Sequence, residues 1–373
     1  MSDRDQTGQG VGWLIGRAES VLRDNVIAQG AGVIGAVGQP AERLLWPVAE
    51  RYNHTLGEHF GEVTGLQLLL LVVAFSGLVT APLWGPDYLR PLTLGAVWAI
   101  FAMGWDIQSG YTGYISFGHS ALSGAAGYTT GLLILHLSPA LPLFVTVPLS
   151  ILATTALGLA IAVPSLRLRG PYFSLVTFVT VLLFYRLTKA LSHWTNSLRG
   201  IRVDVFTYDL TLQYYMVVVP MLAVAAALTY VGRSDVGTVL IAIRENEDAV
   251  SAAGLDPTKF KLWSFVLSAV PMGIGGVLLA HVNAGVDPQT FIIVDNSIQM
   301  IAMAVIGGMS SILGPLGGAF LFVGLRDVFL VGLGEELRWL ALWLLVLLVL
   351  VFARDGLFRL LWRALGSLGG DRR

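Results

Sequence analysis

Residues 107–166 read IQSGYTGYISFGHSALSGAAGYTTGLLILHLSPALPLFVTVPLSILATTALGLAIAVPSL and contain no aspartate, glutamate, lysine or arginine. A transmembrane helix needs about 20 mostly apolar residues, so this stretch has room for more than one crossing. Soluble domains carry roughly 25% charged residues, whereas this chain of 373 residues has only 13%. The stretch and the composition together exclude a monomeric soluble enzyme and predict an all-α polytopic membrane protein.

The composition also limits the chemistry that the chain can perform. Cysteine is absent, which excludes disulfides, thiol nucleophiles and Cys-ligated metals. The net charge of −1 gives no electrostatic footprint for nucleic-acid binding. The sequence has no phosphate-binding loop, HExxH pair or GxSxG elbow. We therefore expect no enzymatic activity, no cofactor, no metal site and no nucleic-acid partner.

Apolar segments predict about ten membrane crossings. They lie near residues 66–84, 92–109, 118–136, 141–163, 172–190, 213–231, 261–280, 297–309, 311–331 and 338–353. Basic residues concentrate on the cytoplasmic side of a membrane. With ten crossings, and leaving out the long N-terminal segment, 11 basic residues fall on one side and 7 on the other. We therefore predict that both termini lie in the cytoplasm.

These segments divide the chain into three parts. Residues 1–65 form an N-terminal cytoplasmic or interfacial extension, 66–353 a transmembrane domain with a loop at 232–260, and 354–373 a basic cytoplasmic tail. Apolar residues recur at helical spacing over 41–60, which predicts an amphipathic helix. Such a helix either lies on the membrane face or packs on the protein as an ordinary surface helix.

Glycine clusters interrupt two of the apolar segments. The first is SGYTGYISFGHSALSGAAGY at 109–128, and the second is IGGMSSILGPLGGAF at 306–320. Paired, Gly-interrupted membrane segments are typical of transporter substrate sites, although glycine also lets helices pack closely. The first interpretation predicts a substrate path lined by Gly113, Ser116, Gly118, His119, Gly307, Gly308, Ser310 and Ser311. In the second, the glycines serve packing alone and His119 bonds a freed backbone carbonyl.

The longest polar stretch between membrane segments is GRSDVGTVLIAIRENEDAVSAAGLDPTKF at 232–260. Asp235 is a residue type that caps helix starts, and Gly254 can take the left-handed conformation that ends a helix. The stretch therefore predicts a helix in the loop. It is either a solvated connection or a docking element for a cytoplasmic partner, using Arg244, Glu245, Glu247, Asp248 and Gly254.

Four motifs resemble the ABC importer permeases of the branched-chain amino acid (LivM-like) type, a family that includes urea and short-chain amide permeases. They are GYTGYISFGHSALSGAAGYTTGLL, VPSLRLRGPYFSLVTF, IRENEDAVSAAGLDPTKFKLWSFVLSAVPMGIGG and VIGGMSSILGPLGGAFL, which occur in the family's order. The resemblance covers about residues 88–332. Within it, residues 245–254 match the family's ATPase-coupling loop, and Gly113, Ser116, Gly118 and His119 match its early broken-helix motif.

The resemblance implies a permease subunit that moves a small polar solute across the cytoplasmic membrane. The implied cargo is a branched-chain or other amino acid, with urea or a short-chain amide as the alternative. The implied partners are a second, related permease, two cytoplasmic ABC ATPase subunits, an extracytoplasmic solute-binding protein and membrane lipid. ATP hydrolysis would then occur on the partner chains. From the residues alone, a stand-alone channel or a secondary transporter remains open.

One loop departs from the family pattern Thr-Gly-Gly-x-x-Gly-Ile. Thr195, Gly200 and Ile201 fit it, but Asn196 and Ser197 replace two glycines. Because this loop is expected to face the binding protein, the departure bears on the identity of the substrate.

Overall fold

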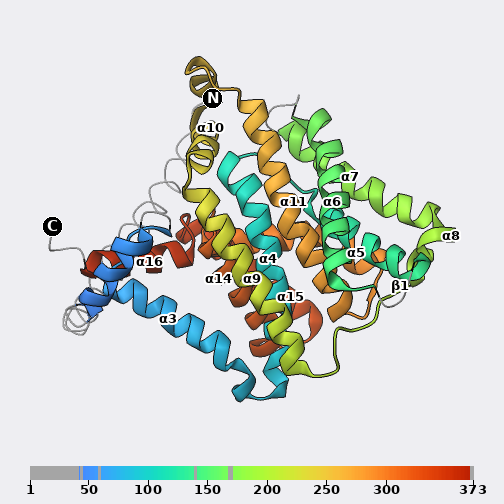
Figure 1. The fold of residues 1–373 in the computed structure, drawn as a ribbon, viewed down its shortest axis with the longest axis horizontal. Coiled ribbons are helices and arrows are strands. Elements are labelled where there is room, and N and C mark those ends of the chain that lie inside the picture. The colour runs from blue at the N-terminus through green and yellow to red at the C-terminus, as the bar shows by residue number, and fades with distance from the viewer. Residues whose placement is uncertain (1–41, 43–44, 58–59, 138–140, 167–170, 370–373) are drawn as a thin grey trace, which may run out of the picture. The chain divides into compact units, whose positions relative to one another are not determined.

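The computed structural model describes residues 42, 45–57, 60–137, 141–166 and 171–369 (Figure 1). Its regular elements are helices, apart from two strands of two residues each. The chain divides into two compact units. Residues 1–77 with 360–373 form one unit, and residues 78–359 form the other.

Helix α4 (Pro86–Trp105) lies at the centre of the larger unit (Figure 1). It packs against α9 (Leu210–Arg233), α11 (Pro257–Val282) and α14 (Leu313–Gly324). Every residue from Gly95 to Trp105 is buried. A helix that is surrounded on all sides needs apolar or small residues around its whole circumference, which is the pattern that this part of α4 has.

A second packed group consists of α5 (His119–His136), α6 (Leu143–Ser165) and α11. Small residues allow these helices to approach closely. A Cβ placed on Gly276 would lie 2.5 Å from the Ala126 Cβ, and one on Gly273 would lie 2.7 Å from Ile151 Cγ1. Neither glycine can therefore carry a side chain without moving a neighbouring helix.

The remaining long helices keep apolar residues exposed. These are α3 (Gly65–Thr80), α7 (Pro171–Ala190), α9 and α15 (Glu335–Phe352). Exposed side chains include Val73, Leu183, Val219 and Leu340, at 58–66% exposure. An apolar surface of this extent suits contact with lipid tails or with another membrane subunit.

All ten segments predicted from the sequence coincide with helices. Among the described residues, however, only six helices are long and apolar enough to cross a membrane, or seven if α15 and the helix after it form one bent span. Helices α4, α5 and α14 do not qualify on their own. Helix α14, with 12 residues, is too short. Helices α4 and α5 are largely enclosed by protein, so their surfaces need not be as apolar as lipid requires. The structure confirms an all-α polytopic membrane protein, while a count of ten crossings stays a prediction.

The chain leaves helical structure at both glycine clusters. Helix α4 continues into the π-helix η3 (Asp106–Gly110), and residues 113–118 are non-helical before α5 begins. In the second cluster, residues 308–312 separate α13 (Val294–Gly307) from α14, which runs into the π-helix η5 (Leu325–Phe329). The prediction of broken, Gly-rich helices is therefore confirmed.

A small cap covers one end of the larger unit. It contains α8 (Ser192–Thr195), the 3-10 helix η4 (Ser197–Arg199), α12 (Pro288–Phe291), and the antiparallel strands β1 (Ile201–Arg202) and β2 (Gly285–Val286). Ile201 pairs with Val286, and Arg202 with Gly285.

The departure from the family's glycine pattern lies in this cap. Asn196 and Ser197 have φ of 55° and 53°, and Gly200 has φ of 70°. Positive φ is the conformation that glycine adopts freely and that asparagine tolerates better than other residues. The structure thus explains why glycine suits this loop. It also shows that Asn196 and Ser197 have a left-handed backbone at the two positions where the family pattern has glycine.

In the smaller unit, residues 45–52 are helical and Asn53–Gly57 form a π-helical turn, η1. The amphipathic helix predicted over 41–60 therefore exists in its described part, while Leu44 and most of the extension fall outside the described residues. The Glu42 side chain accepts backbone N–H bonds from Gly65 and Leu66, at 2.7 and 2.8 Å. These bonds satisfy donors at the start of α3, where a helix has no partners of its own.

Candidate functional site

Asp106 joins the two glycine clusters. The residue is fully buried just beyond the end of α4. Its Oδ1 accepts the backbone N–H of Ser310 at 2.8 Å, and its Oδ2 accepts that of Ser311 at 3.1 Å. The Ser310 hydroxyl in turn donates to the carbonyl oxygen of Gly110, at 2.8 Å. Segments about 200 residues apart in sequence are therefore fixed to each other by one carboxylate and one hydroxyl.

Arg244 connects this junction to the polar loop. Its side chain extends from α10 (Asp235–Ala252), and one guanidinium nitrogen donates to the Gly110 carbonyl at 2.9 Å and to the Ser310 hydroxyl. Its aliphatic part lies against Gly113, where an added Cβ would come within 3.0 Å of Arg244 Cγ. Gly113 has φ of 76°. The glycine thus serves both a left-handed turn and the approach of Arg244.

Glu247 makes a second connection from the same helix. Its Oε1 lies 2.8 Å from Lys261 Nζ, and its Oε2 accepts a hydrogen bond from the Tyr114 hydroxyl. Lys261 is only 2% exposed, and its ammonium group lies 4.4 Å from the centre of the Tyr114 ring. A buried ammonium group needs such compensation. Tyr114 belongs to the non-helical segment 113–118. Helix α10 therefore contacts this segment at two points, through Glu247 at Tyr114 and through Arg244 at Gly113.

We call Asp106, Gly110, Tyr114, Arg244, Glu247, Lys261 and Ser310 the α10 junction. Sequence reasoning placed Arg244, Glu247 and Ser310 among candidate residues but missed Tyr114 and Lys261. For Asp106, the ionisable residue just before the first glycine cluster, the sequence left two interpretations open: a functional group within the membrane or a residue at the membrane surface. Lys261 had a usable signal, since it is one of only three lysines and follows the loop directly.

The ends of α10 agree with the sequence in one detail and differ in another. Gly254 has φ of 85°, so the prediction of a left-handed helix end is confirmed. The N-cap position belongs to Ser234 and not to Asp235, which is the first helical residue. Inside the helix, Asn246 is non-helical, with φ of −160° and ψ of 99°. Its side-chain oxygen accepts the backbone N–H of Ala249 at 3.0 Å and so begins the helix again.

The other candidate docking residues face outward. Glu245, Asp248 and Gly254 are exposed. A Cβ on Gly254 would meet no atom within 4 Å. Ile243 and Val250, however, are buried within the chain at 3% and 6% exposure. The outer surface available to a partner is therefore acidic and rich in small residues. Most of the apolar side of α10 is packed against the rest of the chain.

The predicted path residues fall into two groups. Gly113 is exposed, and Ser310 and Ser311 are partly exposed, all near the α10 junction. Ser116, Gly118, His119, Gly307 and Gly308 are buried.

His119 and Gly308 show how the buried group is held. The ring nitrogens of His119 lie 3.2 Å from the Ser116 hydroxyl and 2.8 Å from the Ser268 hydroxyl. Gly308 has φ of 107°, and a Cβ there would lie 2.6 Å from the carbonyl oxygen of Asp355. In this chain these residues have structural partners that account for them.

Comparison with known proteins identifies the class. Residues 88–353 match the family described as "Branched-chain amino acid transport system / permease component". The chain belongs to this family. The match includes all but the first two residues of α4, both broken segments and the whole of α10, so every residue of the α10 junction lies within it.

Individual relatives agree with the family. This permease is 26% identical over 293 residues to the high-affinity branched-chain amino acid transport system permease protein LivM of Salmonella typhimurium, covering 70% of the chain and 67% of the relative. LivM of Escherichia coli gives 26% over 291 residues with the same coverage. BraD of Pseudomonas aeruginosa is 24% identical over 293 residues, covering 71% of the chain and 92% of the relative. The permease is thus a multi-pass protein of the cytoplasmic membrane and a transport component.

Proposed function

We propose that this chain is one of two permease subunits of an ABC importer that carries branched-chain or other small amino acids inward. Its family membership and the printed functions of LivM and BraD support this cargo. The alternative cargo is urea or a short-chain amide. Asn196 and Ser197 keep that alternative open, because they change a loop that we place on the side of the binding protein.

The observation that carries the proposal is the α10 junction. In an importer whose ATPases are separate chains, the permease must respond to ATP binding elsewhere. Helix α10 presents Glu245 and Asp248 outward, while Arg244 and Glu247 fasten it to both broken segments. A movement of α10 therefore has a direct route to the segments that we propose as the substrate path. ATP hydrolysis itself is assigned to two partner subunits, and substrate delivery to an extracytoplasmic binding protein.

Arg244→Gln tests this coupling role. The variant keeps a polar side chain but loses the charged donor that reaches Gly110 and Ser310. Charged hydrogen bonds contribute about 1.5–3 kcal/mol each, so we expect uptake into proteoliposomes to fall about tenfold or more. Assembly with the sister permease should persist. Arg233→Gln, an exposed arginine at the end of α9, is the matched control and should transport normally. Normal ligand-stimulated ATP hydrolysis and uptake in the Arg244 variant would rule out the coupling role.

The proposed orientation places both termini, residues 354–373 and α10 in the cytoplasm, with the β1–β2 cap outside. The cysteine-free sequence allows a direct test. We expect Asp248→Cys to react with a membrane-impermeant maleimide only after the cells are opened, and Arg199→Cys to react in intact cells. Both positions are exposed. Arg199 is a better site than Gly200, where a side chain would overlap the Val286 backbone. The reverse labelling pattern would show that the topology is the opposite of the one proposed. Helix α10 would then lie outside the cell, where it cannot contact the ATPases.

A further inference from the structure

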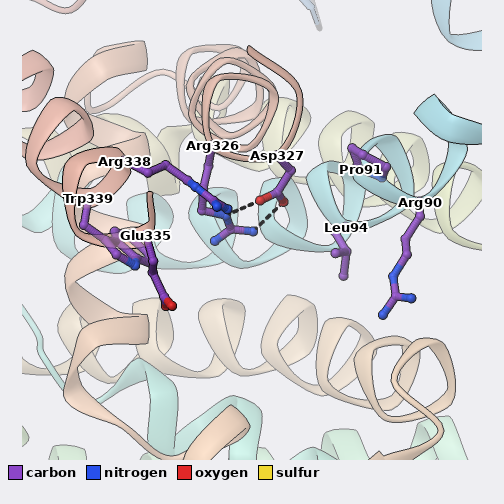
Figure 2. A pocket seen from close by; sticks show the side chains of 8 residues that line it. All are labelled: Arg90, Pro91, Leu94, Arg326, Asp327, Glu335, Arg338 and Trp339. Atoms are coloured by element: carbon purple, nitrogen blue, oxygen red, sulfur yellow. Dashed lines mark hydrogen bonds and ion pairs between the residues drawn. The ribbon is translucent and has the colours of Figure 1, made fainter. Parts of the chain in front are cut away.

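A pocket of about 390 Å³ lies at the opposite end of α4 from the α10 junction. It is lined by three arginines, two acids and three apolar residues: Arg90, Arg326, Arg338, Asp327, Glu335, Pro91, Leu94 and Trp339 (Figure 2). These come from the first turns of α4, from η5 and from the start of α15. The α10 junction does not use any of them.

The arginines in this pocket are not equally paired. Arg326 forms a two-point ion pair with Asp327, with both N–O distances at 2.8 Å, and donates to Gln299 at 3.0 Å. Arg338 differs, because its Nε is shielded from solvent and has no hydrogen-bond partner among the described residues. Within the part of the chain that the structure describes, Arg338 also forms no ion pair, unlike Arg326, so the charge of its guanidinium group is available to a ligand.

The charge of the pocket defines what that group is. Figure 2 shows Arg338 and Arg326 extending into the same part of the pocket, with Arg90 beyond Leu94. Three guanidinium groups face two carboxylates, and one of those carboxylates is already engaged by Arg326. The remaining charge is positive, and guanidinium groups match the oxygens of phosphate geometrically.

The surroundings indicate where the phosphate comes from. Immediately beyond the pocket, α15 carries an outward apolar row of Leu337, Leu340 and Leu344, with exposures of 56%, 64% and 53%. Trp339 lines the pocket and stacks on Trp343, with ring centres 6.3 Å apart. Tryptophans with arginines at the end of an apolar helix are typical of the level of lipid headgroups.

We propose that this pocket binds a phosphate oxyanion, supplied by the headgroup of an anionic phospholipid whose acyl chains lie along α15. The phosphate oxygens accept hydrogen bonds from the guanidinium groups of Arg338 and Arg90. The acyl chains cover the leucine row. The site would tie η5 and the starts of α4 and α15 to one lipid molecule.

Lipid binding to the purified full-length chain tests the proposal. In detergent, native mass spectrometry would follow phosphatidylglycerol, diacylglycerol of the same chain length, and inorganic phosphate. We expect phosphatidylglycerol to bind and diacylglycerol not to bind. Arg90→Gln with Arg338→Gln should weaken phosphatidylglycerol binding at least about tenfold, as expected when charged hydrogen bonds are lost. Arg338→Lys should bind with intermediate affinity, because it keeps the charge but loses the planar, two-point donor geometry of the guanidinium group.

Arg186→Gln is the matched control, since Arg186 is an exposed arginine on α7 outside the pocket. It should bind phosphatidylglycerol like the unmodified chain, and thermal unfolding should show that all variants are folded. Unchanged phosphatidylglycerol binding in the double glutamine variant would overturn the proposal. Inorganic phosphate binding as tightly as the lipid would overturn the lipid as the source. Displacement of the lipid by leucine would overturn the phosphate assignment in favour of a carboxylate site.

Discussion

Asp106→Asn is expected to lower the stability of the permease by about 3 kcal/mol, because the side chain loses one of its two acceptor oxygens and leaves a part-buried backbone N–H without a partner. An asparagine side chain has one acceptor oxygen, so its NH₂ group would face the N–H of Ser310 or Ser311. The turn at 308–312 would lose its fixed position against Gly110. The midpoint of thermal unfolding in detergent measures the effect, and uptake should be abolished.

The control for this variant is Asp87→Asn at the other end of α4, the helix that precedes Asp106. Asp87 is exposed in the first turn of α4, so its replacement should change stability by about 0.5 kcal/mol or less. If both variants unfold at the same temperature as the unmodified chain, Asp106 does not hold the two clusters together.

Glu247→Gln should destabilise the permease by a similar or larger amount. It leaves the Lys261 ammonium, which is 2% exposed, without its carboxylate partner, and breaking a buried ion pair on one side costs about 3–5 kcal/mol. Thermal unfolding and proteoliposome uptake should both show the loss. Asp235→Asn, at the exposed start of α10, should have neither defect.

A double variant separates stability from coupling. Glu247→Gln with Lys261→Met removes both charges, and neutral replacements of a buried pair often restore stability. We expect the unfolding temperature to recover while uptake stays low, because the ion pair to Lys261 is lost and the hydrogen bond from Tyr114 now meets a neutral acceptor. Recovery of uptake together with stability would show that the pair is needed only for folding.

Much of this fold follows from local patterns that the sequence displays directly. Uncharged apolar runs define helices, and Gly254 marks a helix end because few residues accept positive φ. The break at Asn246 was not predicted, since nothing in a run of polar helical residues distinguishes an internal cap from a continuous helix. The crossing count is harder for a physical reason. Helices enclosed by protein, such as α5, are not required to be as apolar as helices that face lipid.

The candidate site was predicted only in fragments, because its contacts join residues far apart in the chain. Spacing placed Arg244 and Glu247 on one helix and Ser310 in a broken segment. It gave no sign that Asp106 reaches Ser310, or that Lys261 returns to Glu247. Glu247 was expected to face an ATPase together with Glu245 and Asp248. The structure gives it a buried partner inside the chain, a choice that depends on tertiary packing.

The non-helical residue Asn246 divides α10 into two helical pieces joined by a hinge. Arg244 is anchored on one side of the hinge and Glu247 on the other. If an ATPase pushes on the exposed end of α10 near Gly254, as the proposed coupling role requires, the load reaches Glu247 before it reaches Arg244. We therefore expect the contact with Tyr114 to be released before the contact with Ser310.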